Sequence, residues 1–191
     1  MQAVLDFWLG VPQAEDTTYP KRRKLWFSKN PQVDQEIRDR FLSLYEQAAT
    51  GKLAHWQQSP QGCLALLILL DQFSRHLFRG EARSFATDRQ AVNIAKGAIA
   101  QGFDQQLQPV QRIFIYLPLE HSENLLDQQR SVELFRQLSE AAPELQDTYD
   151  FALRHQAVIQ RFGRFPHRNS ILGRTSTPAE LEFLQQPGSS F

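Results

Sequence analysis

The chain has 191 residues, of which 21 are basic and 21 acidic, so its formal net charge is zero. This length fits one domain, and the neutral balance argues against a protein that coats nucleic acid. The single cysteine, Cys63, excludes an intramolecular disulfide and suits a reducing compartment. The apolar run 63–70 is far shorter than the roughly 20 residues of a membrane span. We therefore expect a cytoplasmic protein that binds neither nucleic acid nor membrane.

Helix start and stop signals recur along the chain, with apolar residues at three- and four-residue steps between them. These signals predict helices over 31–50, 60–79, 87–101, 109–118, 122–141, 143–162 and 178–185. Asn30 and Ser122 are predicted N-caps, Gly163 is a predicted helix stop, and Thr177 to Glu180 form a predicted capping box. Pro118 is expected to end or kink its helix.

No segment shows the alternating pattern of a β-strand. The predicted fold class is therefore all-α: a single domain over residues 1–191, with about eight helices in antiparallel pairs. An irregular, arginine-rich loop is expected at about 163–176, and a C-terminal tail at 187–191. We expect Phe191 in this tail to dock on its own domain.

A first group of charged residues continues the apolar run along one helix face. Asp71, Arg75 and Arg79 follow each other at four-residue steps, so their side chains can pair in sequence. Charged side chains on the same helix face as the apolar run are expected to be partly buried and therefore paired. They form either a structural ion-pair network or an arginine site for an anionic ligand, oriented by Asp71.

A second group lies at the break between two predicted helices. Glu120, His121 and Glu123 combine carboxylates and an imidazole, which are acid–base groups and metal ligands. Their spacing differs from the zinc and di-metal signatures, so we expect no metal. The alternative is that Glu120 and Glu123 cap the following helix.

The third group is the densest and lies in the last third of the chain. It comprises His155, Arg161, Arg164, His167, Arg168, Asn169 and Arg174. Residues 151–179 carry five arginines and no acid, whereas residues 97–150 carry nine acids and three arginines. The arginines either neutralise that acidic segment or face a pocket for an anionic ligand, because arginine recognises carboxylate and phosphate in a bidentate manner.

Several motifs together resemble one known family. They are the segments 4–10, 25–27, 69–80, 117–123, 161–169 and 187–191. In this order they resemble the bacterial and fungal family catalogued as domain of unknown function 924, over essentially the whole chain. One departure is Ser74-Arg75-His76, where Pro-Arg-Asn is expected. The resemblance implies an all-α fold similar to tetratricopeptide-repeat arrays, with motif residues in the three groups above, and it implies no established activity.

The function stays open between three interpretations. The first is binding, with turnover left open, of a small anionic metabolite such as a phosphate or carboxylate. Arg75, Arg164 and Arg168 would grip it, and His121, His155 or His167 would be the acid–base group, oriented by Glu120. The second is a helical-repeat adaptor that holds a peptide in an arginine-lined groove. The third is that the arginine and glutamate network is purely structural; no cofactor is expected in any of them.

Overall fold

The computed structural model describes residues 1–10 and 19–190, and the predicted docking of Phe191 lies outside this part of the chain. None of the described residues is in a β-strand, which confirms the predicted all-α class. None of the helices in this part of the chain has both the length and the hydropathy that a membrane span requires. The chain divides into two compact units, and the prediction of one domain stays a prediction.

The first unit contains Met1–Arg79 and Arg83–Pro118. Its helices are α1 (Gln2–Leu9), α2 (Tyr19–Phe27), α3 (Pro31–Ala49), α4 (Pro60–Leu67), α5 (Ser74–Leu77), α6 (Asp88–Ala100) and most of α7 (Pro109–Glu120). Short 3₁₀ turns cover Ala54–Gln58, Ala82–Phe85 and Asp104–Gln106. The turns of α4 and α5 are joined by a wider π-helical turn, Ile68–Phe73, into one continuous helical run.

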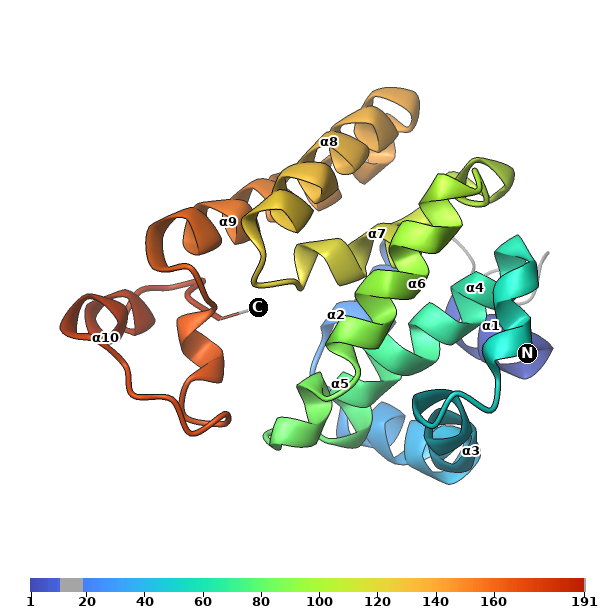
Figure 1. Ribbon diagram of the computed structural model, residues 1–191, viewed down its shortest axis with the longest axis horizontal. Coiled ribbons are helices and arrows are strands. Elements are labelled where there is room, and N and C mark those ends of the chain that lie inside the picture. Colours follow the sequence, from blue (N-terminus) through green and yellow to red (C-terminus); the bar gives the residue numbers. More distant parts are fainter. Residues whose placement is uncertain (11–18, 191) are drawn as a thin grey trace. The chain divides into compact units, whose positions relative to one another are not determined.

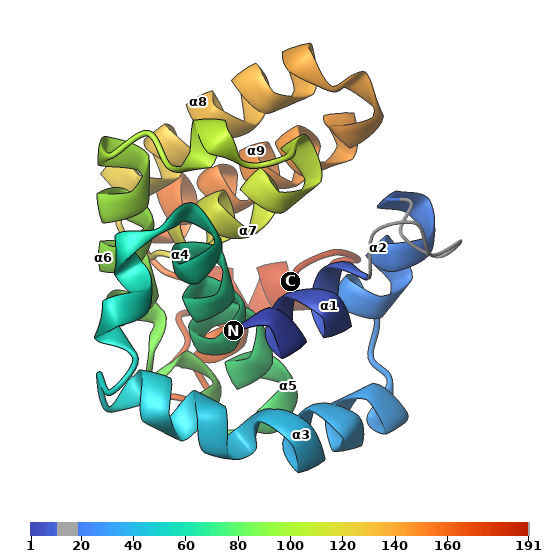
Figure 2. The same cartoon turned by 90° about the vertical axis from the view of Figure 1, so that its right-hand side faces the viewer.

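This central run forms the core of the first unit because its apolar residues face every direction. All residues from Leu64 to Leu70 are at most 2% exposed. α3 lies against the π-helical turn and α5, and α1 lies against α4 (Figure 2). The indole N–H of Trp26 donates to the backbone oxygen of Trp8 at 2.7 Å, which ties α2 to α1.

The second unit contains Gly80–Ala82 and the chain from Leu119 onward. Its helices are α8 (Leu125–Ala141), α9 (Gln146–Phe162) and α10 (Pro178–Leu184), with 3₁₀ turns at Pro143–Leu145 and Pro166–Arg168. α8 and α9 pack side by side as an antiparallel hairpin (Figure 1). At the end of α9 a small apolar cluster forms, made of Val158, Ile159 and Phe165 with Phe162 and Phe183 against it.

The predicted helix ends agree with the structure where the signal is local. Asn30 caps α3, Gly163 ends α9 in the left-handed region at φ 70°, and the capping box of Thr177 and Glu180 is present. The predicted cap Ser122 is wrong, because Asn124 caps α8 and the Ser122 hydroxyl instead donates to Asp127.

Candidate functional site

The predicted pair of Asp71 and Arg75 lies in the first unit. Arg75 donates to the backbone oxygen of Asp71 at 2.6 Å and binds both carboxylate oxygens of Asp88 at 3.0 and 3.1 Å. Its Nη1 also lies 3.3 Å from the buried Asp71 carboxylate. Burial alone would lower the pKa of the Arg75 guanidinium, but the two carboxylates outweigh it and raise that pKa. Arg75 therefore holds α5 to the start of α6.

Arg79 also binds a carboxylate of the first unit. Its Nε and Nη2 donate to the two oxygens of Asp34, each at 2.9 Å, and Nδ1 of His76 lies 2.7 Å from the same carboxylate. Burial raises the pKa of Asp34, and the hydrogen bonds from Arg79 and His76 reverse this and lower it. Arg75 and Arg79 thus join elements of the first unit, and neither enters the ligand site proposed below.

A buried carboxylate–imidazole pair lies in the second unit. Glu120 ends α7 and is 3% exposed, and His155 lies on the buried face of α9 and is 4% exposed. Nδ1 of His155 lies 3.0 Å from Glu120 Oε1 and 2.9 Å from the backbone oxygen of Phe151. Two acceptors at one nitrogen place the proton on Nδ1, an arrangement that fixes the orientation of the imidazole.

The other two predicted histidines gather around the same buried ring. His121 lies with its ring centre 6.1 Å from that of His155, and Phe165 lies 5.6 Å from His155 and 5.7 Å from His167. Arg168 stacks on the Phe165 ring at 4.5 Å and donates to the backbone oxygen of His121 at 3.0 Å. The structure therefore brings the three histidines together, with the fully buried side chain of Phe165 packed against two of them.

Glu123, in the segment between α7 and α8, binds the arginine-rich loop. Its two oxygens accept from Arg174 at 2.7 and 2.9 Å, and Oε1 also accepts from the backbone N–H of Phe165 at 2.8 Å. Arg174 further donates to Asn169, which donates to Ser176. Burial raises the pKa of Glu123, and the hydrogen bonds from Arg174 and Phe165 outweigh it and lower the pKa. Glu123 is therefore a loop anchor and does not cap α8.

Arg164 and Glu180 form another bidentate pair, between the loop and α10. Nε and Nη2 of Arg164 donate to the two Glu180 oxygens at 2.7 and 2.8 Å, and Nη2 also reaches the backbone oxygen of Thr175. Glu180 is 2% exposed and also accepts from the backbone N–H of Thr177 at 2.7 Å. The bond from Arg164 lowers the pKa of Glu180 to about 2.

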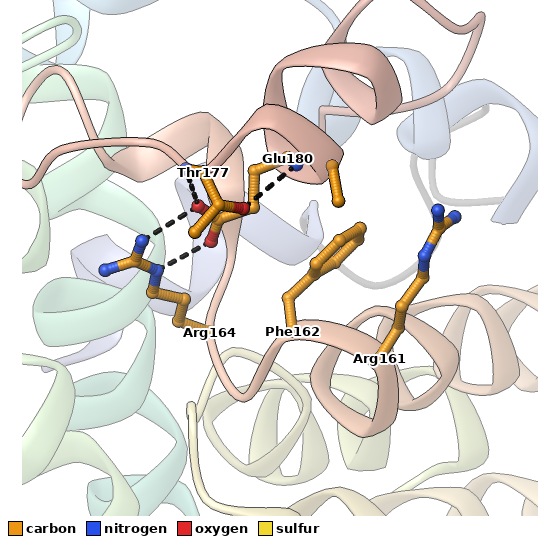
Figure 3. Close-up of a pocket in the computed structure, with 6 residues that line it drawn as sticks. Arg161, Phe162, Arg164, Thr177 and Glu180 are labelled. Carbon is orange, nitrogen blue, oxygen red and sulfur yellow. Dashed lines mark hydrogen bonds and ion pairs between the residues drawn. The ribbon is translucent and has the colours of Figure 1, made fainter.

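A pocket of about 560 Å³ opens beside this pair (Figure 3). It is lined by Arg161, Phe162, Arg164, Thr177, Ala179 and Glu180. Arg161, in the last turn of α9, is exposed and stacks at 4.7 Å on the neighbouring Phe162 ring. Its guanidinium makes no hydrogen bond or ion pair with any residue that the structure describes. In Figure 3 the Phe162 side chain lies between Arg161 and Arg164.

Only two of the residues predicted as site members, Arg161 and Arg164, line this pocket. The other predicted site residues of the second unit lie either around the His155 ring or in the hydrogen-bond network of Glu123 and Arg174. The other four lining residues, Phe162, Thr177, Ala179 and Glu180, are not among the predicted site residues, and the sequence pattern predicts only a capping box for Thr177 and Glu180. Charge is a signal in the sequence that could have indicated Glu180 as a partner for these arginines, because it is the first acidic residue after the basic segment 151–179.

Comparison with known proteins places the chain in a family. A family model described as a bacterial protein of unknown function (DUF924) matches residues 4–188. A solved structure of a protein of unknown function from Agrobacterium tumefaciens is similar, with a TM-score of 0.83 and 36% sequence identity over 96% of each chain. No functionally curated protein matches. Because the family model spans nearly the whole sequence, the chain belongs to the DUF924 family.

Proposed function

We propose that this protein binds a small anionic molecule through Arg161 in the pocket of the second unit. The observation that carries the proposal is that the Arg161 guanidinium lacks a carboxylate partner in the described part of the chain. It lines a pocket, and no carboxylate among the described residues pairs with it. The neighbouring arginines Arg164 and Arg174 each donate two hydrogen bonds to a glutamate of the same unit.

The stacking of Arg161 on Phe162 supports a binding role. A guanidinium that lies over an aromatic ring keeps its N–H groups available at its edge. Stacking also restricts the long side chain, so less conformational entropy is lost when an oxyanion binds. The planar fork of N–H donors then matches a carboxylate or phosphate oxygen pair.

The proposal concerns binding and leaves the acid–base role of Glu120, His121, His155 and His167 a prediction. A cytoplasmic location is kept as part of the proposal, and the support for it is that the lone cysteine, Cys63, is free and buried. The α8–α9 hairpin is the kind of helix pair that stacks in tetratricopeptide-repeat-like arrays, which supports that part of the predicted fold.

Titration with simple anions tests the proposal. Binding of acetate, 3-phenylpropionate, inorganic phosphate and phenyl phosphate would be followed by amide chemical shifts. We expect at least one of them to shift residues of the pocket, and Arg161→Ala to weaken that binding at least about tenfold, the loss of one charge-assisted contact.

The matched control is Arg130→Ala, which removes the same charge from an exposed position on α8. It should leave the affinity within about twofold, as expected for an exposed charge that does not line the pocket. If none of the four anions binds, or if Arg161→Ala binds them as tightly as the wild type, the proposal is wrong.

A further inference from the structure

The charge balance of the pocket restricts which anion fits. Glu180 lies in its wall and accepts three hydrogen bonds, two from Arg164 and one from the backbone of Thr177. Arg164 and Glu180 therefore neutralise each other. Among the lining residues, Arg161 is left as the only cation without a carboxylate partner in the described part of the chain.

From this arrangement we infer that the ligand is a carboxylic acid with an apolar body, bound as a monoanion. This inference rests on the proposed function, which requires only that some anion binds at Arg161. One unpaired cation balances one negative charge. A second charge, as on a phosphate monoester near neutral pH, would face the Glu180 carboxylate without a cation of its own.

The remaining lining favours an apolar ligand body. Phe162 presents its ring to the pocket, and Ala179 contributes a methyl group. Phe183 supports the Phe162 ring from α10, with the ring centres 5.1 Å apart. A pocket volume of about 560 Å³ is in the range of sites for small organic molecules. An acid with a phenyl or branched alkyl group would therefore contact Phe162 while its carboxylate reaches Arg161.

The hydroxyl of Thr177 adds one further polar contact. It accepts a hydrogen bond from the backbone N–H of Glu180 at 3.3 Å. A hydroxyl has one proton to donate as well, and in the described residues this proton has no acceptor. A ligand with a hydroxyl or carbonyl group away from its carboxylate would thus find a donor here, on the other side of Phe162 from Arg161 (Figure 3).

Matched ligands test the inference by chemical-shift titration at about pH 7.5. We expect 3-phenylpropionate to bind at least about fivefold more tightly than acetate, which lacks the apolar body, and than phenyl phosphate, which is mainly a dianion at that pH. Lowering the pH to about 5.5 converts much of the phenyl phosphate to its monoanion. Its affinity should then rise several-fold, while that of 3-phenylpropionate stays nearly constant.

A variant separates the apolar contact from the charge. Phe162→Leu keeps an apolar side chain but removes the ring on which Arg161 stacks. Both acids should bind more weakly, and 3-phenylpropionate should lose more affinity than acetate, because only 3-phenylpropionate also loses the contact of its phenyl group with the ring. Tighter binding of phenyl phosphate than of 3-phenylpropionate at about pH 7.5, with Arg161 required, would overturn this inference and leave the proposed function standing. Failure of every anion to bind would overturn both.

Discussion

Replacing Glu123 by alanine will lower the free energy of unfolding by about 2–4 kcal/mol. The substitution removes three acceptor contacts at once: two to Arg174 and one to the backbone N–H of Phe165. The Arg174 side chain is 25% exposed, and its guanidinium would be left with only the Asn169 side chain and the backbone oxygen of Phe165 as acceptors. Urea denaturation followed by far-UV circular dichroism measures the loss.

A matched control for this prediction is Glu133→Ala. Glu133 also accepts two hydrogen bonds from an arginine, Arg136, but both side chains are about 40% exposed on α8. Solvent screens such a pair, so the urea midpoint should not change measurably. Equal midpoints for Glu123→Ala and the wild type would show that the loop is not held by this carboxylate. The conservative change Glu123→Gln keeps an acceptor for the backbone N–H of Phe165. Its urea midpoint should therefore lie between those of Glu123→Ala and the wild type.

Helix positions could be predicted from the sequence wherever a helix end is encoded by neighbouring residues. The caps at Asn30 and Thr177 and the stop at Gly163 are of this kind, since a side chain within three residues bonds the free backbone groups. α1 has no such signal, because its N-cap, Met1, makes no side-chain bond. Its Val4 and Trp8 are fully buried, so tertiary packing stabilises this short helix.

The candidate site could be predicted only as a region. Composition left two alternatives, that the arginines of 151–179 meet carboxylates of 97–150 or that they face a pocket, and the pair of Arg174 and Glu123 is a contact of the first kind. It spans 51 residues, a separation at which sequence patterns carry no pairing information. Arg164 takes its partner from α10 instead, whereas Arg161 has no carboxylate partner among the described residues. The path of the loop 163–176 brings Arg164 and Arg174 to glutamates, whereas Arg161 precedes the loop on α9.

The second large effect is expected at Glu180. Glu180→Gln should lower the free energy of unfolding by about 1–3 kcal/mol at neutral pH, because the charge-assisted bonds to Arg164 lose their charge while the side chain stays buried. The N-terminus of α10 also depends on this side chain, which accepts from the backbone N–H of Thr177. Urea denaturation of the wild type and the variant over a range of pH measures the difference.

The pH dependence identifies the ionised Glu180 as the cause. The pKa of Glu180 in the folded protein is lowered to about 2, below the roughly 4.3 of an unfolded chain. A lowered pKa means that the stabilisation is fully present above the unfolded value and is lost as the pH falls toward 2. The wild type and Glu180→Gln should therefore differ by a constant amount above about pH 5 and converge below it.

The matched control for this prediction is Glu182→Gln, the same substitution on the exposed side of α10. It should leave stability unchanged at neutral pH, since the side chain stays in water. A difference between the wild type and Glu180→Gln that persists unchanged at low pH would contradict the prediction. The Glu180 side chain would then act through its shape and neutral hydrogen bonds, and its charge would not be available to disfavour dianions in the Arg161 pocket.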